Sequence, residues 1–127
     1  MPSNRKFSKP VVAALAKDKI LGIRAGSGDH RFIGVWMVVV GDRLFIRSWG
    51  VKKKSWYRAF LEDPTGTIQA AGRELEVRAR PRVSERDKAA VDRAYAEKYD
   101  TPGAIKYVKG FVRSKKRRDT TTELLPI

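Results

Sequence analysis

The side chains best suited to chemistry in this sequence are cations and hydroxyls gathered ahead of one short helix. Lys52, Lys53 and Lys54 are followed by Ser55, which suits the N-cap of a helix that begins at Trp56. A helix start carries partial positive charge, so three lysines ahead of it are unfavourable unless an anion binds there. A bound phosphate or carboxylate would resolve this conflict. A solvated lysine run in a loop is the simpler alternative.

A second group of cations lies around a predicted hairpin tip. The turn Gly26-Ser27-Gly28-Asp29 separates two β-rich runs and brings Arg24, His30 and Arg31 close to one another. These side chains form a second candidate anion contact. The turn lacks the spacing and the lysine of a P-loop, so an ordinary hairpin turn is the simpler interpretation.

The sequence also excludes several kinds of chemistry. It has no cysteine and a single histidine, His30, which excludes disulfides, thiolate nucleophiles and a metal site built from cysteines or several histidines within one chain. No metal is therefore expected. An enzyme built from this chain would depend on a cofactor, or on carboxylates, serines and basic residues.

Length and charge indicate a single basic domain spanning residues 1–127, with residues 1–7 expected to be flexible. No apolar run approaches the ~18 residues of a membrane span and no signal-peptide pattern opens the chain, so we expect a cytoplasmic protein without a membrane partner. Its 28 Lys and Arg outnumber 14 Asp and Glu, for a net charge of +14. Such a charge attracts phosphorylated ligands or nucleic acid. The cations cluster at 52–54, 73–82 and 115–118.

The longest apolar segment predicts a buried β-hairpin. Residues 32–40 are apolar on both alternating faces, so this strand should be covered on both sides and lie centrally in its sheet. Gly41-Asp42 forms a two-residue turn, and residues 43–49 form the returning strand.

The other predicted elements complete an α+β domain. A second hairpin turns at Ala71-Gly72, and Ser84 starts a helix with a capping-box-like pattern. We predict strands over 20–25, 32–40, 43–49, 67–71, 73–82 and 119–126, and helices over 10–17, 56–61, 84–99 and from 102 onward. Six mostly antiparallel strands with helices between some of them predict a small antiparallel barrel with peripheral helices.

Several of these residues resemble a known group of proteins. The pattern consists of Ser48, Gly50, the lysine-bearing loop, Trp56-Tyr57, Leu61, Pro64 and a threonine-rich last strand ending in Leu125-Pro126. It resembles the split-barrel flavin and deazaflavin proteins, which include the pyridoxamine-phosphate-oxidase-like and deazaflavin-dependent nitroreductase families. It is most similar to a bacterial family of unknown function related to them. The similarity covers residues 21–24, 30–49, 56–64, 92–99 and 120–126.

This resemblance implies a six-stranded FMN-binding-like split barrel, a homodimer, and FMN or a deazaflavin coenzyme along the dimer cleft. It also implies that the first hairpin and the loop before the short helix hold the phosphate side of the coenzyme. The residues at those positions are Arg24, His30, Arg31, Ser48, Lys52, Lys53, Lys54 and Ser55. Trp49 and Trp56 complete the expected coenzyme-binding set, and no catalytic residue is assigned.

Three functions remain open from the sequence. The first is a flavin- or deazaflavin-dependent oxidoreductase, in which the coenzyme carries the hydride chemistry. The second is a barrel that binds nucleic acid or another polyanion through basic grooves and exposed aromatics such as Trp49. The aromatic periodicity favours core positions and no RNP-type pattern is present, which weakens this alternative. The third is a non-redox binding module for an anionic small molecule.

Overall fold

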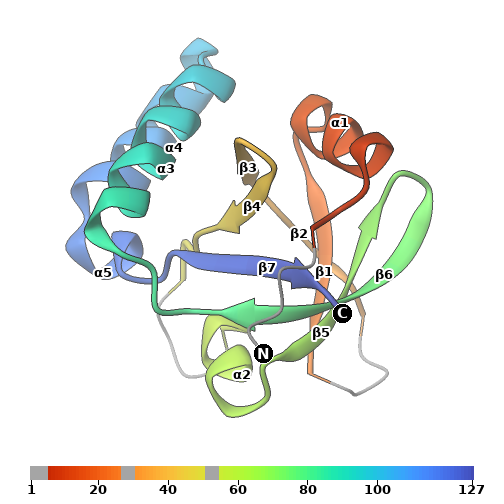
Figure 1. The fold of residues 1–127 in the computed structure, drawn as a ribbon. Helices are drawn as coiled ribbons and strands as arrows, with labels where there is room; N and C mark the ends of the chain where they lie inside the picture. The colour runs from red at the N-terminus through yellow and green to blue at the C-terminus, as the bar shows by residue number, and fades with distance from the viewer. Residues whose placement is uncertain (1–5, 27–30, 51–54) are drawn as a thin grey trace.

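The computed structural model describes residues 6–26, 31–50 and 55–127 as an α+β domain, shown in Figure 1. The strands are β1 (Leu21–Ala25), β2 (Ile33–Val35), β3 (Met37–Val40), β4 (Arg43–Ile46), β5 (Thr65–Ala70), β6 (Arg73–Arg80) and β7 (Thr122–Pro126). The helices are α1 (Lys9–Lys17), α2 (Trp56–Glu62), α3 (Glu85–Lys98), α4 (Pro102–Arg113) and α5 (Lys115–Arg118). None of the helices in this described part is long and apolar enough to cross a membrane.

The seven strands form one antiparallel sheet in the order β2-β1-β5-β6-β7-β4-β3. The first and last strands of this order, β2 and β3, follow one another along the chain and are separated only by Trp36. The sheet therefore curls into a nearly closed barrel, and its two edge strands are connected to each other through the backbone of Trp36. Counting β2 and β3 as one pass of the chain, the barrel has the six strands that the sequence predicts.

Both predicted hairpin turns are confirmed. Val40 pairs with Arg43 across Gly41-Asp42, and Ala70 pairs with Arg73 across Ala71-Gly72. Gly41 has φ +65°, and Ala71 and Gly72 have φ 53° and 71°. Positive φ at these positions matches the twist of two-residue hairpins.

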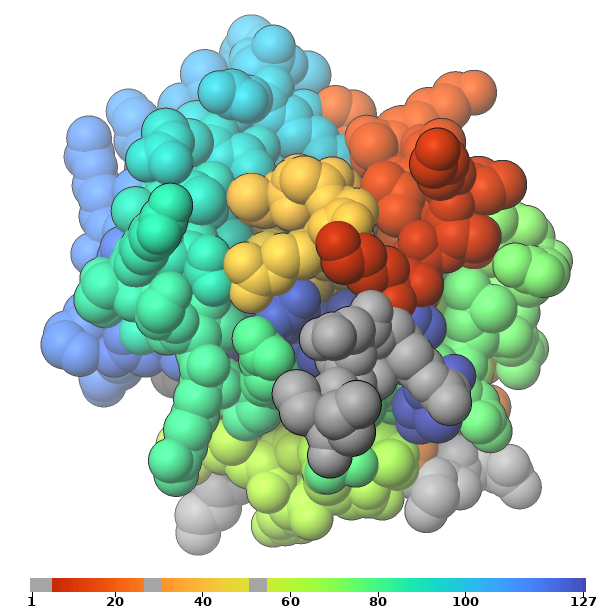
Figure 2. All heavy atoms as spheres, viewed as in Figure 1, coloured from red at the N-terminus to blue at the C-terminus, as the bar shows by residue number. Residues whose placement is uncertain are grey.

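The β3–β4 hairpin explains the long apolar segment. Met37, Leu44 and Ile46 point into the barrel core, whereas Val38 and Phe45 pack in a second core beneath α3 and α4. One face of the molecule shows this hairpin between α3 and α1 (Figure 2). Coverage on both sides is thus confirmed for β3.

The same prediction is wrong for β2. Ile33 and Gly34 are exposed, with 45% of Ile33 accessible, and β2 and β3 are the two edges of the sheet. The cause is a break in the strand at Trp36, which pairs with neither neighbouring strand. On one side of the break β2 pairs with β1, and on the other side β3 pairs with β4.

Four further features differ from the predictions. The strand that begins at Arg43 ends at Ile46 rather than Trp49, and the last strand begins at Thr122 rather than Asp119. The basic run 115–118 forms the short helix α5, which Ser114 caps with its hydroxyl. Phe7, which the sequence placed in a flexible start, is buried in the barrel core.

Candidate functional site

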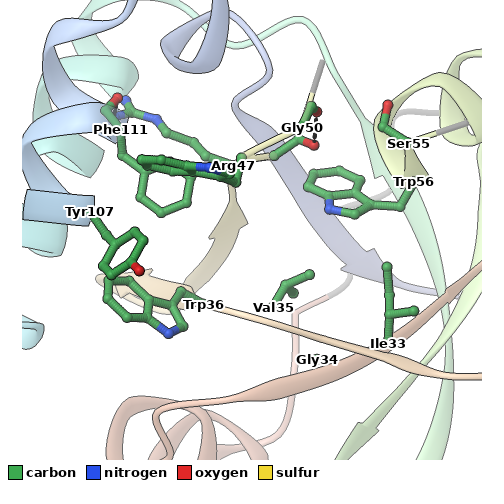
Figure 3. Close-up of a pocket in the computed structure, with 12 residues that line it drawn as sticks. Ile33, Gly34, Val35, Trp36, Arg47, Gly50, Ser55, Trp56, Tyr107 and Phe111 are labelled. Carbon is green, nitrogen blue, oxygen red and sulfur yellow. Dashed lines mark hydrogen bonds between the residues drawn. The ribbon is translucent and has the colours of Figure 1, made fainter. Parts of the chain in front are cut away.

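A cavity of about 500 Å³ opens where the barrel strand breaks. Figure 3 shows Trp36, Tyr107 and Phe111 at one end and Ser55, Trp56 and Ile33 at the other, with Val35 between them. The complete lining is Ile33, Gly34, Val35, Trp36, Arg47, Ser48, Trp49, Gly50, Ser55, Trp56, Tyr107 and Phe111. Its walls are mainly aromatic and aliphatic side chains contributed by β2, α2, α4 and the segment after β4.

Two tyrosines, Tyr95 of α3 and Tyr99 at the C-cap of that helix, hold the broken strand in place. Tyr99 stacks on Trp36 with ring centroids 4.3 Å apart, and its hydroxyl accepts from the Met37 N–H at 3.0 Å. The Tyr95 hydroxyl donates to the Trp36 carbonyl and accepts from the Arg47 N–H, both at 3.1 Å. These hydroxyls satisfy backbone groups that the strand break removes from the sheet, which would otherwise be buried unpaired. They thereby fix one wall of the cavity.

Removing the Tyr99 hydroxyl tests this arrangement. We expect Tyr99→Phe to lower the free energy of unfolding by about 1–3 kcal/mol, because the buried Met37 N–H loses its acceptor. Burial raises the pKa of Tyr99, so the hydroxyl stays protonated and able to donate at neutral pH. Urea denaturation measures the change. Tyr107→Phe is the matched control, since Tyr107 is exposed and should change stability by less than about 0.5 kcal/mol. Equal effects of the two variants would contradict a bracing role for Tyr99.

Trp49 forms a second wall and is held from two sides. The guanidinium of Arg117 lies 3.6 Å from the centre of its ring, and Arg117 Nε donates to the Trp49 carbonyl at 2.9 Å. The ring meets Tyr107 and Phe111 edge-on at centroid distances of 5.3 and 5.4 Å. Trp49 remains 42% exposed, so it borders the mouth of the cavity.

Gly110 determines how closely Trp49 approaches α4. A Cβ atom at this position would lie 2.5 Å from Trp49 Cζ3, so Gly110→Ala must displace the indole. We expect a changed tryptophan emission spectrum with little loss of stability, because alanine favours the helix by about 1 kcal/mol over glycine. Gly103→Ala is the control, since open space surrounds that position in the same helix. If both variants emitted like the parent protein, the close contact of Trp49 with Gly110 would be disproved.

The described side chains that face the interior of the cavity are uncharged. Among the described residues 6–26, 31–50 and 55–127, its lining includes no carboxylate and no histidine. The Ser48 hydroxyl donates to the Gly50 carbonyl, whereas the Ser55 hydroxyl accepts from the Arg58 N–H at 3.3 Å and donates to no group among the described residues. The cavity can therefore surround a planar apolar group and offer it a few hydrogen bonds.

Arg47 contributes to the lining but directs its side chain away from it. The guanidinium is fully buried and donates to Asp92 Oδ1 at 2.6 Å and to Thr121 Oγ1 at 2.7 Å. It also donates to the carbonyls of Phe111 at 3.0 Å and Lys88 at 2.9 Å. Burial lowers its pKa, and the pairing with Asp92 opposes that shift. Arg47 thus ties the segment after β4 to α3, α4 and the start of β7.

A smaller hollow of about 340 Å³ adjoins the cavity and carries positive charge. Arg24 and Arg31 line it, and it shares Ile33, Ser55 and Trp56 with the main cavity. The Arg24 guanidinium lies over the Phe32 ring, 4.6 Å from its centre, which orients this cation. An apolar space and a cationic space are therefore contiguous.

The structure places six of the ten predicted coenzyme-binding residues around these two spaces. Arg24 and Arg31 line the hollow, Ser48 and Trp49 line the cavity, and Ser55 and Trp56 line both. His30, Lys52, Lys53 and Lys54 lie outside the described residues. Ser55 is confirmed as the N-cap of α2.

The sequence did not identify the α4 side of this site. Tyr107 and Phe111 lie four residues apart on α4, a spacing that places both on one side of a helix. The sequence predicted only that a helix runs from residue 102 onward. That this side of α4 meets the mouth of the barrel follows from the tertiary packing alone.

An antiparallel barrel that opens at one broken strand and is flanked by helices defines the class of split-barrel folds. Within that class, the chain belongs to a family of uncharacterized proteins conserved in bacteria (DUF2255), which matches residues 12–124. No protein with a curated description matches the chain.

Two solved structures share the fold. A conserved hypothetical protein from Mycobacterium tuberculosis superposes with a TM-score of 0.59 at 11% identity, over 100% of this chain and 84% of that one. An FAD-binding protein from Mesorhizobium loti superposes with a TM-score of 0.57 at 14% identity, over 97% of this chain and 92% of that one. At these identities the comparison concerns the fold alone.

Proposed function

We infer that this protein binds a flavin-type coenzyme, FMN or a deazaflavin, with its ring in the aromatic cavity and its phosphate toward Arg24 and Arg31. The observation that carries this proposal is the junction of the two spaces. The aromatic cavity and the cationic hollow meet along Ile33, Ser55 and Trp56. A molecule with a planar apolar end and an anionic end fits that arrangement.

The residues present suit such a coenzyme. A volume of about 500 Å³ lies within the range of small-molecule sites, and the aromatic walls match a ring system. Arginine guanidinium groups bind phosphate oxygens through charge-assisted hydrogen bonds. Similarity in fold to a protein described as FAD-binding supports the same proposal.

The bound coenzyme would supply hydride-transfer chemistry. The protein would contribute orientation and exclusion of water, with Trp36 fixed by Tyr99 and Trp49 fixed by Arg117. The Ser55 hydroxyl can donate a hydrogen bond at the junction of the two spaces. On this basis the protein is an oxidoreductase-like protein.

A second copy of the chain would complete the site. Large apolar side chains around the mouth are exposed, namely Ile20, Ile33 and Trp49. A homodimer that buries them would close the cavity and remove this apolar surface from water. Light scattering at micromolar concentration should give twice the mass of the chain. A monomer would remove the shared-cleft arrangement.

Direct titration tests the coenzyme proposal. We expect FMN or a deazaflavin to bind with a changed visible spectrum, and the affinity to fall only a few-fold between about 50 and 200 mM salt, because apolar burial is insensitive to screening. Binding of a colourless anionic small molecule, with neither coenzyme bound, would favour the non-redox module. No spectral change with FMN or a deazaflavin would reject the proposal.

A further inference from the structure

The outer face of α4 carries a row of cations. Between Pro102 and Arg118 the chain has seven Lys and Arg and no Asp or Glu. Lys106, Lys109 and Arg113 are all exposed, and their spacing places them on one side of α4 over about 10 Å of helix axis. We call these three residues the α4 cationic row.

Neighbouring acids are engaged by other cations. Asp92 pairs with Arg47 and Arg118, and Glu85 also pairs with Arg118. Asp119 pairs with Lys88 and Lys115. Within the described ranges 6–26, 31–50 and 55–127, no acidic group forms an ion pair with the α4 cationic row. Its charge is therefore available to an external polyanion.

The packing of α4 favours nucleic acid over a membrane as this polyanion. An amphipathic helix binds a membrane by burying its apolar face in the lipid. On α4 that face is formed by Ala104, Val108 and Phe111, which are buried in the second core against α3. Lys106 Nζ lies 5.2 Å from the centre of the exposed Tyr107 ring, and the exposed Trp49 ring meets Tyr107 edge-on. These rings offer stacking surfaces for unpaired bases.

We propose that the α4 cationic row binds the phosphate backbone of single-stranded nucleic acid, independently of base sequence. The interaction is weak and salt-sensitive, because three exposed cations contact few phosphates. It uses the outer surface of α4, and bound bases would share the rings of Trp49 and Tyr107 with the mouth of the cavity.

The test compares the parent protein with the triple variant Lys106→Gln/Lys109→Gln/Arg113→Gln. Fluorescence anisotropy with a labelled single strand of about 20 mixed nucleotides gives Kd between about 25 and 200 mM salt. Each phosphate contact contributes a slope of about −0.7 in log K against log salt, so the triple variant should lose about 2 units of slope. We expect its affinity at the lowest salt to fall at least tenfold. Lys109→Gln alone should remove about 0.7 units.

A matched control removes the same charge elsewhere. Arg73→Gln/Arg78→Gln/Arg82→Gln takes three exposed cations from β6 and the residues after it, and should change the affinity less than threefold. Three outcomes would overturn the proposal. They are equal losses in both triple variants, no binding by the parent protein at about 25 mM salt, and tighter binding to vesicles containing phosphatidylserine than to the oligonucleotide. The melting temperature of both variants should stay close to that of the parent, because exposed charges contribute little to stability.

Discussion

Arg47→Met is expected to lower the free energy of unfolding by about 3–5 kcal/mol, the cost of removing one partner from a buried ion pair. The guanidinium is fully buried, and its loss leaves Asp92 without its shortest contact. It also leaves the Lys88 and Phe111 carbonyls and the Thr121 hydroxyl without this donor. Methionine fills part of the volume but donates no hydrogen bond.

Urea denaturation of the variant should show a large decrease in the midpoint. Arg47→Lys is expected to recover only part of the loss, because one ammonium cannot reach partners on both α3 and the start of β7 in the way that a planar guanidinium does. Arg113→Met is the matched control, since Arg113 is exposed and should change stability by less than about 0.5 kcal/mol. A loss below about 1 kcal/mol for Arg47→Met would show that the interior tolerates its removal.

Much of the fold could be predicted because its signals are local. Gly41-Asp42 and Ala71-Gly72 lie between β-rich runs, and two-residue loops of this kind select their turn geometry from their own residues. Ser55 and Ser84 each precede a helix. The hydroxyl of each serine accepts a hydrogen bond from a backbone N–H in the first turn of that helix. Such features need no information from distant parts of the chain.

The break at Trp36 could not be predicted because its cause lies far along the chain. The apolar alternation of residues 32–40 continues through Trp36 without interruption. The hydroxyls of Tyr95 and Tyr99 nevertheless take over the backbone groups at this point, from about sixty residues away. Periodicity reports which faces are apolar, but it does not report where a strand leaves its sheet.

The burial of Arg47 was missed for a related reason. In sequence it follows Ile46 as an ordinary charged residue of a strand that continues to Trp49. Its partners come from α3, α4 and the start of β7, and only their convergence makes burial of the charge tolerable. The basic run 115–118 was likewise identified only as a cluster of cations, whereas Arg118 bonds to Asp92 and Glu85.

The candidate site was predicted in part. Arg24, Arg31, Ser55 and Trp56 were selected from charge, helix-end chemistry and resemblance, and they line one contiguous pair of spaces. Their role in coenzyme binding remains a prediction. The aromatic wall from α4 depends on how that helix packs across the barrel mouth, which local periodicity does not specify.

The double variant Arg24→Gln/Arg31→Gln should weaken FMN binding roughly 50-fold, because hydrogen bonds to a charged group contribute about 1.5–3 kcal/mol each and exposure reduces that contribution here. FMN carries a phosphate with about two negative charges at neutral pH, whereas riboflavin has the same ring and no phosphate. Riboflavin affinity should therefore change less than threefold. Fluorescence titration of both ligands against both proteins isolates the interaction between the phosphate and the arginines.

Comparing FMN with riboflavin also shows whether Arg24 and Arg31 bind the phosphate, support the ring or fold, or take no part in binding. Arg73→Gln/Arg78→Gln removes two exposed cations from β6, away from both spaces, and serves as the control for net charge. If FMN and riboflavin weakened equally in the Arg24/Arg31 variant, these arginines would support the ring or the fold rather than the phosphate. If FMN binding were unchanged, its phosphate would be held elsewhere, and replacement of Lys52, Lys53 and Lys54 with alanine would be the next measurement. Only a selective loss of FMN places the anionic end of the coenzyme between Arg24 and Arg31.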